Sequence, residues 1–247
     1  MPKVDALTAT NPLILVLALF AGMSPALLWL FFWLREDTNR REPLGLIILT
    51  FIAGMLAVVF VLPFERFIGT LTDNNTLLTT LWAASEEFVK YFAFAAIVGK
   101  SVYLDEPIEY VIYAMTAALG FAALENGLFL VHPLASNDGV VSLLTGNLRF
   151  LGATLLHSVT TGIVGASVGL AYFKSRETKF FYWVLGMGAA ITLHTVFNFF
   201  IIQKGGENFL QVFAFLWVVT IIIMLLCEKL RRMGRYVQHV QPAPLVQ

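Results

Sequence analysis

Four stretches of the sequence place ionisable and amide side chains inside long apolar runs. They are Glu86-Glu87-x-x-Lys90, Glu125-Asn126, His157 and His194-x-x-x-Asn198. Side chains of these kinds can activate water, transfer protons and stabilise a developing oxyanion. Histidine and glutamate can also bind a metal ion. The four stretches therefore indicate either a hydrolytic centre or a proton pathway.

The spacing within these stretches suits helices. Glu86 and Lys90 are four residues apart and would share one helix face, as would His194 and Asn198. Glu86 and Glu87 are adjacent and would point about 100° apart, so only one of them can face a common centre. We expect the other glutamate to pair with Lys90 or with a neighbouring helix.

The composition is that of a membrane protein. Of the 247 residues, 58% are hydrophobic and 13% are charged, whereas a soluble domain carries about 25% charged residues. The mean hydropathy is +0.79. The formal net charge is zero, so nothing indicates a nucleic-acid partner. The single cysteine, Cys227, excludes a disulfide framework and a cysteine-based zinc site.

Seven apolar runs are each long enough to cross a bilayer, which takes roughly 20 residues. We expect membrane helices at residues 12–34, 44–64, 77–99, 108–131, 148–173, 180–202 and 209–227. The predicted fold is therefore an all-α, polytopic transmembrane helical bundle of about seven helices. Residues 1–235 would form a single transmembrane domain with its catalytic core at 77–202, and residues 236–247 a flexible cytoplasmic tail.

The loop charges predict the orientation of the bundle, because cytoplasmic loops are enriched in Lys and Arg. Eleven such residues would lie on one side of a seven-helix arrangement, and Lys3, Arg66, Arg149 and Lys204 on the other. The N-terminus would then be outside and the C-terminus in the cytoplasm. We expect a multi-pass protein of the cell membrane, specifically the bacterial cytoplasmic membrane, with the lipid bilayer as its surroundings.

The polar stretches fall at one depth. Glu86, Glu125, His157 and His194 lie about six to nine residues from the outer ends of their helices, which corresponds to roughly 9–14 Å at about 1.5 Å per residue. An ionisable group inside a spanning helix costs about 2.5–3.5 kcal/mol on insertion scales, so such groups persist where they pair or line a wet cavity. The depths predict one polar site in the outer half of the membrane.

These motifs resemble those of the PrsW family of intramembrane proteases and, more distantly, of the CAAX prenyl proteases and their bacterial relatives. The resemblance covers about residues 80–200 and rests on the Glu-Glu-x-x-Lys, Phe121-x-x-x-Glu125-Asn126, His157 and His194-x-x-x-Asn198 motifs, which stand in the family's order. It implies cleavage of a single-span, membrane-anchored protein, such as an anti-sigma factor, near the extracytoplasmic side. The CAAX pattern has Glu-Glu-x-x-x-Arg and Phe-x-x-x-His, so its prenyl-substrate preference does not transfer.

The resemblance also implies roles for the motif residues. Glu86 would be the general base, and Glu125 would help hold the attacking water or share its proton. His194 and Asn198 would stabilise the oxyanion. His157 would do likewise or protonate the leaving amine.

Further residues are expected to support this centre. Lys90 would keep Glu87 ionised. Asn126, Thr160 and Thr161 would either pack between helices or make interhelical hydrogen bonds. Arg149 lies at the mouth of the predicted fifth helix, where it either supports the site or extends to the membrane interface.

The alternatives concern the metal and the class of function. We favour glutamate-activated water without a metal ion, although His157, His194 and Glu125 could bind zinc with one open position for water. The sequence has no His-Glu-x-x-His motif. A proton-coupled transporter or channel is the alternative function, but the polar groups occupy one layer and no internal repeat is visible. A non-catalytic scaffold would not need so many buried ionisable groups.

Overall fold

The structure is a computed structural model that describes residues 11–35, 42–136, 152–200 and 209–240. These residues form seven α-helices and no strand, which confirms the predicted all-α bundle. The helices are α1 (Pro12–Leu34), α2 (Leu44–Ile68), α3 (Asn75–Val98), α4 (Glu109–Ala135), α6 (Thr154–Leu170), α7 (Arg176–Asn198) and α8 (Phe209–Val240).

Five of the helices, α1, α2, α4, α7 and α8, are long and apolar enough to cross a membrane. The other two depart from an ordinary span in different ways. Helix α3 carries Glu86, Glu87 and Lys90, and α6 is an apolar helix of only 17 residues that contains His157. Both atypical helices carry polar motifs, as do the ordinary spans α4 and α7.

Several helix boundaries follow local capping signals. The side chains of Asn11, Asn74 and Ser175 accept hydrogen bonds from the first-turn amides of α1, α3 and α7. These caps begin α3 and α7 a few residues before the predicted starts. Helix α8 continues to Val240, well beyond the predicted end at residue 227, so the expected tail begins within its last turn. The predicted start of the fifth helix, at residue 148, lies outside the described residues.

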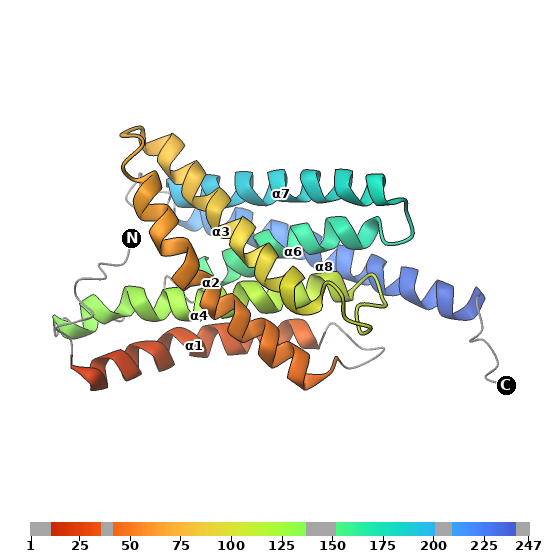
Figure 1. The fold of residues 1–247 in the computed structure, drawn as a ribbon, viewed down its shortest axis with the longest axis horizontal. Coiled ribbons are helices and arrows are strands. Elements are labelled where there is room, and N and C mark those ends of the chain that lie inside the picture. The colour runs from red at the N-terminus through yellow and green to blue at the C-terminus, as the bar shows by residue number, and fades with distance from the viewer. Residues whose placement is uncertain (1–10, 36–41, 137–151, 201–208, 241–247) are drawn as a thin grey trace.

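The helices pack in two groups (Figure 1). Helices α1, α4, α6 and α7 lie side by side in that order, α8 packs against α6, and the α2–α3 pair crosses this layer obliquely against α4 and α7. Helices α4 and α6 are the most completely buried. The four helices that carry the motifs, α3, α4, α6 and α7, are thus neighbours.

Helices α2 and α4 approach each other backbone to backbone. A Cβ atom on Gly54 would lie 1.9 Å from the carbonyl oxygen of Ala117, and one on Gly120 would lie 1.9 Å from that of Phe51. Only glycine permits this approach, which is typical of helix packing in membranes. The contact fixes α2 against the central helix of the bundle.

Candidate active site

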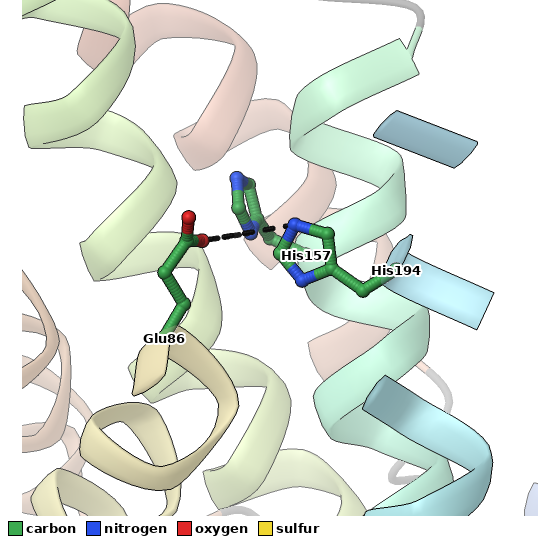
Figure 2. A group of neighbouring side chains, drawn as sticks. All are labelled: Glu86, His157 and His194. Atoms are coloured by element: carbon green, nitrogen blue, oxygen red, sulfur yellow. Dashed lines mark ion pairs between the residues drawn. The ribbon is translucent and has the colours of Figure 1, made fainter. Parts of the chain in front are cut away.

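Three side chains from three helices converge in the interior of the bundle (Figure 2). Oε2 of Glu86 on α3 lies 3.8 Å from Nδ1 of His157 on α6 and 3.7 Å from Nε2 of His194 on α7. The two imidazole rings are nearly perpendicular, with centroids 5.1 Å apart. Oε2 of Glu86 is buried and has no hydrogen-bond partner among the described residues. It is therefore an open acceptor that faces two histidines.

Glu87, the next residue, has the opposite environment. It is fully buried, and its Oε1 lies 2.5 Å from Nζ of Lys90 and 2.8 Å from Nδ1 of His194. The hydroxyls of Thr160 and Thr161 donate to its two oxygens at 2.9 and 2.8 Å. These contacts confirm that one glutamate faces the centre while the other pairs with Lys90 and with neighbouring helices, including the two threonine hydrogen bonds.

The partners of each histidine fix its tautomer, because a neutral imidazole has one donor and one acceptor nitrogen. Nδ1–H of His194 donates to Glu87, which leaves Nε2 unprotonated. Nε2–H of His157 donates to Oε2 of Glu125 on α4 at 2.9 Å, and its Nδ1 accepts from Nζ of Lys90 at 3.0 Å. Both rings thus turn an unprotonated nitrogen toward the open carboxylate oxygen, and each has its far nitrogen held by a glutamate.

Lys90 is the cationic side chain that the described part of the chain places in this cluster. It is fully buried, its Nζ lies 4.0 Å from Oε2 of Glu86, and it sits 5.1 Å from the ring centroid of Phe121. The aromatic face stabilises a desolvated ammonium. The ion pair with Glu87 and this ring both stabilise the buried ammonium.

The remaining predicted residues lie farther from the centre. Nδ2 of Asn126 donates to Oγ1 of Thr154 at 2.8 Å, which confirms an interhelical hydrogen bond between α4 and α6. Asn198 is the last residue of α7 and is half-buried one turn beyond His194, and the described residues give it no hydrogen bond to the cluster. Arg149 lies outside the described residues.

The structure adds a carboxyl group that the sequence analysis missed. Glu65 on α2 is only 7% exposed, and its main-chain oxygen accepts a hydrogen bond from Nε1 of Trp82 on α3 at 3.0 Å. The predicted helix ended at residue 64, which left Glu65 at the start of a loop. The charges of Glu65 and Arg66 indicated a helix end in the sequence, whereas α2 continues to Ile68.

The family can now be identified by comparison with known proteins. The family model described as PrsW family intramembrane metalloprotease matches residues 42–226, which is well over half of the chain. The match spans every residue of the cluster. The chain belongs to the PrsW family. It is accordingly a membrane protease, and its apolar helices fit a multi-pass protein of the cell membrane.

Relatives named Protease PrsW support this assignment. That of Geobacillus kaustophilus (strain HTA426) is 28% identical over 188 residues, covering 74% of this chain and 79% of the relative. That of Halalkalibacterium halodurans is 28% identical over 222 residues, covering 87% and 98%. That of Bacillus subtilis (strain 168) is 23% identical over 203 residues, covering 80% and 89%. No solved structure matches the chain significantly.

The word metalloprotease in the PrsW family description raises the question of whether the cluster fits an ion. One ligand atom each from Glu86, His157 and His194 lies within 4.8 Å of the others. The measured 3.7 and 3.8 Å separations are slightly wider than the ~3.4 Å between tetrahedral ligands about 2.1 Å from zinc. Histidines whose far nitrogen donates to a carboxylate are typical metal ligands. The donor set therefore fits a divalent cation.

Two further observations bear on that fit. The glutamate that joins the histidines is Glu86, whereas Glu125, the residue expected in the zinc alternative, instead holds the far nitrogen of His157. The described residues bring three carboxyl groups, Glu86, Glu87 and Glu125, into a cluster with one ammonium, that of Lys90, so an added cation would balance negative charge in a low-dielectric interior. An ion bound to His157 would displace the hydrogen bond from Lys90.

Proposed function

We propose that this PrsW-family protein hydrolyses a peptide bond in a membrane-anchored protein substrate near the extracytoplasmic side of the membrane. The substrate class is a single-span protein such as an anti-sigma factor, cleaved in a site-1-type step. The excess of Lys and Arg in one set of loops supports the orientation, and the depth of the polar motifs supports the position of the site. The observation that carries the proposal is the open, buried Oε2 of Glu86 facing two histidines.

Glu86 holds the attacking water and accepts its proton. Its Oε2 is the acceptor of the cluster that no neighbouring donor occupies, whereas Glu87 is saturated by hydrogen bonds. The water adds to the scissile carbonyl, and the proton held by Glu86 passes to the leaving amine. Glu125 contributes by fixing the ring of His157.

The oxyanion needs a donor other than His194 in this arrangement. Nε2 of His194 carries no proton while Nδ1–H donates to Glu87. Asn198 lies one turn further along the same face of α7, and the Lys90 ammonium lies 4.0 Å from Oε2 of Glu86. We assign oxyanion stabilisation to these two residues, since positive charge and N–H donors both favour a developing negative oxygen.

Glu86, His157 and His194 would also be the ligands of a divalent ion, in which case Oε2 of Glu86 would bind the ion and its second oxygen would remain to accept the proton of the water. When bound, zinc lowers the proton affinity of its water and polarises a carbonyl. Glu125 and Glu87 would hold the far nitrogens of the two histidines, which orients both rings and makes them stronger ligands. The proposal thus changes the expectation from the sequence, which favoured glutamate without metal.

Substitution of the open carboxylate tests the proposal. Glu86→Gln keeps the size of the side chain but cannot accept a proton, so cleavage of a co-expressed single-span substrate should fall at least 10²-fold or so. Ser85→Ala is the matched control. The Ser85 hydroxyl donates to the main-chain oxygen of Trp82 within α3, so this variant should cleave the substrate normally. Cleavage that survives both Glu86→Gln and Glu125→Gln would refute the enzyme mechanism.

The ion is tested separately on purified protein in detergent. A chelator should abolish cleavage, and added zinc should restore it. Equilibrium binding should give one ion per chain in the wild type and none in His194→Ala. Full activity after complete removal of metal would contradict the metal site and support hydrolysis by Glu86 without an ion.

A further inference from the structure

Asn126 and Thr154 form a buried polar pair between α4 and α6. Nδ2 of Asn126 donates to Oγ1 of Thr154 at 2.8 Å, and the two residues are 1% and 0% exposed. Hydrogen bonds of this kind link helices inside a membrane, where neither group meets water. The proposed mechanism uses neither side chain, and Thr154 belongs to none of the four sequence motifs.

The pair lies beside the hydrogen bond that fixes His157. Asn126 follows Glu125 on α4, and Thr154 lies three residues before His157 on α6, on the same helix face. Nε2–H of His157 donates to Oε2 of Glu125 at 2.9 Å. Two consecutive residues of α4 therefore hold two residues of α6 that are one turn apart.

The start of α6 has little local support. Thr154 is the first residue of the helix, and Gly152 and Ala153 before it form a π-helical turn. The N-cap residue Ala153 provides no side-chain hydrogen bond to the first turn, which a capping side chain would otherwise stabilise. The position of this turn, which ends at His157, therefore depends on contacts with other helices.

The opposite end of the contact between α4 and α6 is fixed by glycine. A Cβ atom on Gly165 would lie 2.4 Å from the carbonyl oxygen of Tyr110, and one on Gly169 would lie 2.5 Å from that of Pro107. Close backbone packing thus holds the later turns of α6 against the region where α4 begins. Because the two helices run antiparallel, the first turn of α6 lies at the end where they could separate.

We propose that Thr154 and Asn126 are positioning residues that tie the first turn of α6 to α4. Their hydrogen bond keeps His157 within reach of Glu125 and directed at Oε2 of Glu86. The inference rests on the proposed function, which requires the histidine at this place. Displacement of a group in an active site by about 1 Å can cost 10²-fold in rate, so a bond outside the reacting centre can control the rate.

The test compares Thr154→Val with Thr154→Ser in the full-length protein. Valine has nearly the shape of threonine but lacks the hydroxyl, so kcat should fall about tenfold. KM should stay nearly unchanged, because the pair does not contact the substrate. Serine keeps the hydroxyl and should retain most of kcat. Ser158→Ala is the matched control, since the Ser158 hydroxyl is equally buried but bonds only to Leu155 of its own helix in the described structure.

A second measurement does not depend on proteolysis. The affinity for cobalt(II), a spectroscopic probe for zinc sites, should fall about tenfold in Thr154→Val and stay near wild type in Thr154→Ser and Ser158→Ala. Asn126→Leu should reproduce both losses. The double variant should lose little more than either single variant, because the two substitutions break the same bond.

Wild-type kcat and cobalt affinity in Thr154→Val would overturn the proposal. An equal loss in Thr154→Ser would overturn it too, as would losses that multiply in the double variant. If Thr154→Val does not fold, Asn126→Leu decides in its place, and wild-type kcat in that variant overturns the proposal. The proposed function itself fails only if Glu86→Gln still cleaves, so the two failures are distinguishable.

Discussion

The two faces of α3 treat adjacent glutamates in opposite ways. On one face, Glu87 accepts hydrogen bonds from an ammonium, a histidine and two threonines, and it is fully buried. On the other face, Oε2 of Glu86 is also buried but has no hydrogen-bond partner among the described residues. A buried charge with several partners holds helices together, whereas an unsatisfied one lowers stability and is retained for chemistry. The first face should therefore control folding and the second activity.

The largest expected effect comes from breaking the Glu87 face. Glu87→Gln removes the nearer of the two carboxylates beside the buried Lys90 ammonium, the one 2.5 Å away, so the free energy of unfolding should fall by about 3–5 kcal/mol. Glu86→Gln should leave that free energy unchanged or raise it, because Oε2 loses no hydrogen bond. Chaotrope-induced unfolding in detergent micelles measures both. Equal destabilisation by the two substitutions would contradict the division between the faces.

A paired substitution provides the control for that experiment. Glu87→Gln with Lys90→Met removes both charges, and the double variant should be more stable than the sum of the single losses implies. Additive losses would mean that the 2.5 Å contact between Nζ of Lys90 and Oε1 of Glu87 contributes little.

The next largest effect tests the Glu86 face, through the zinc affinity of the site. Glu125→Gln weakens the hold on Nε2 of His157, which should lower the affinity for zinc about 10–100-fold, as loss of an orienting carboxylate does in metal sites. Competition with a coloured chelator measures it. The control is Thr116→Val on the same helix, whose hydroxyl bonds only within α4 in the described structure. An unchanged zinc affinity in Glu125→Gln would place the ion elsewhere.

Much of this arrangement follows from the sequence. The hydrophobic runs predict all seven described helices, because a membrane span requires a continuous apolar stretch. The adjacency of Glu86 and Glu87 predicts their division of roles, since a helix separates neighbours by about 100°. Both predictions depend only on the order of residues along a single helix.

The rest depends on contacts between helices, which local spacing does not specify. The sequence could not choose between Glu86 and Glu125 as the carboxylate beside both histidines, because that choice depends on the rotation of α3 and α4. It also could not predict that Glu65 is buried near the end of α2, since a charged residue after an apolar run resembles the start of a loop. Helix α8 extends past the apolar run, where Glu228 pairs with Arg231 and Arg232 at the three- and four-residue spacings that stabilise a helix.

The smallest expected effect separates the two threonines that hold Glu87. The hydroxyl of Thr160 has carbonyl acceptors in its own helix, at Leu156 and His157, besides the carboxylate. Thr161 donates to Glu87 alone among the described residues. Thr161→Val should therefore lower the free energy of unfolding by about 1.5 kcal/mol, as loss of a hydrogen bond to a charged group does. Thr160→Val should lower it by less, because the Thr160 hydroxyl has one proton to share among three acceptors. The same micelle unfolding assay measures the difference, with the exposed Thr192→Val as the control. A larger loss at Thr160 would show that the carboxylate depends mainly on Oε1, the oxygen it shares with Lys90 and His194.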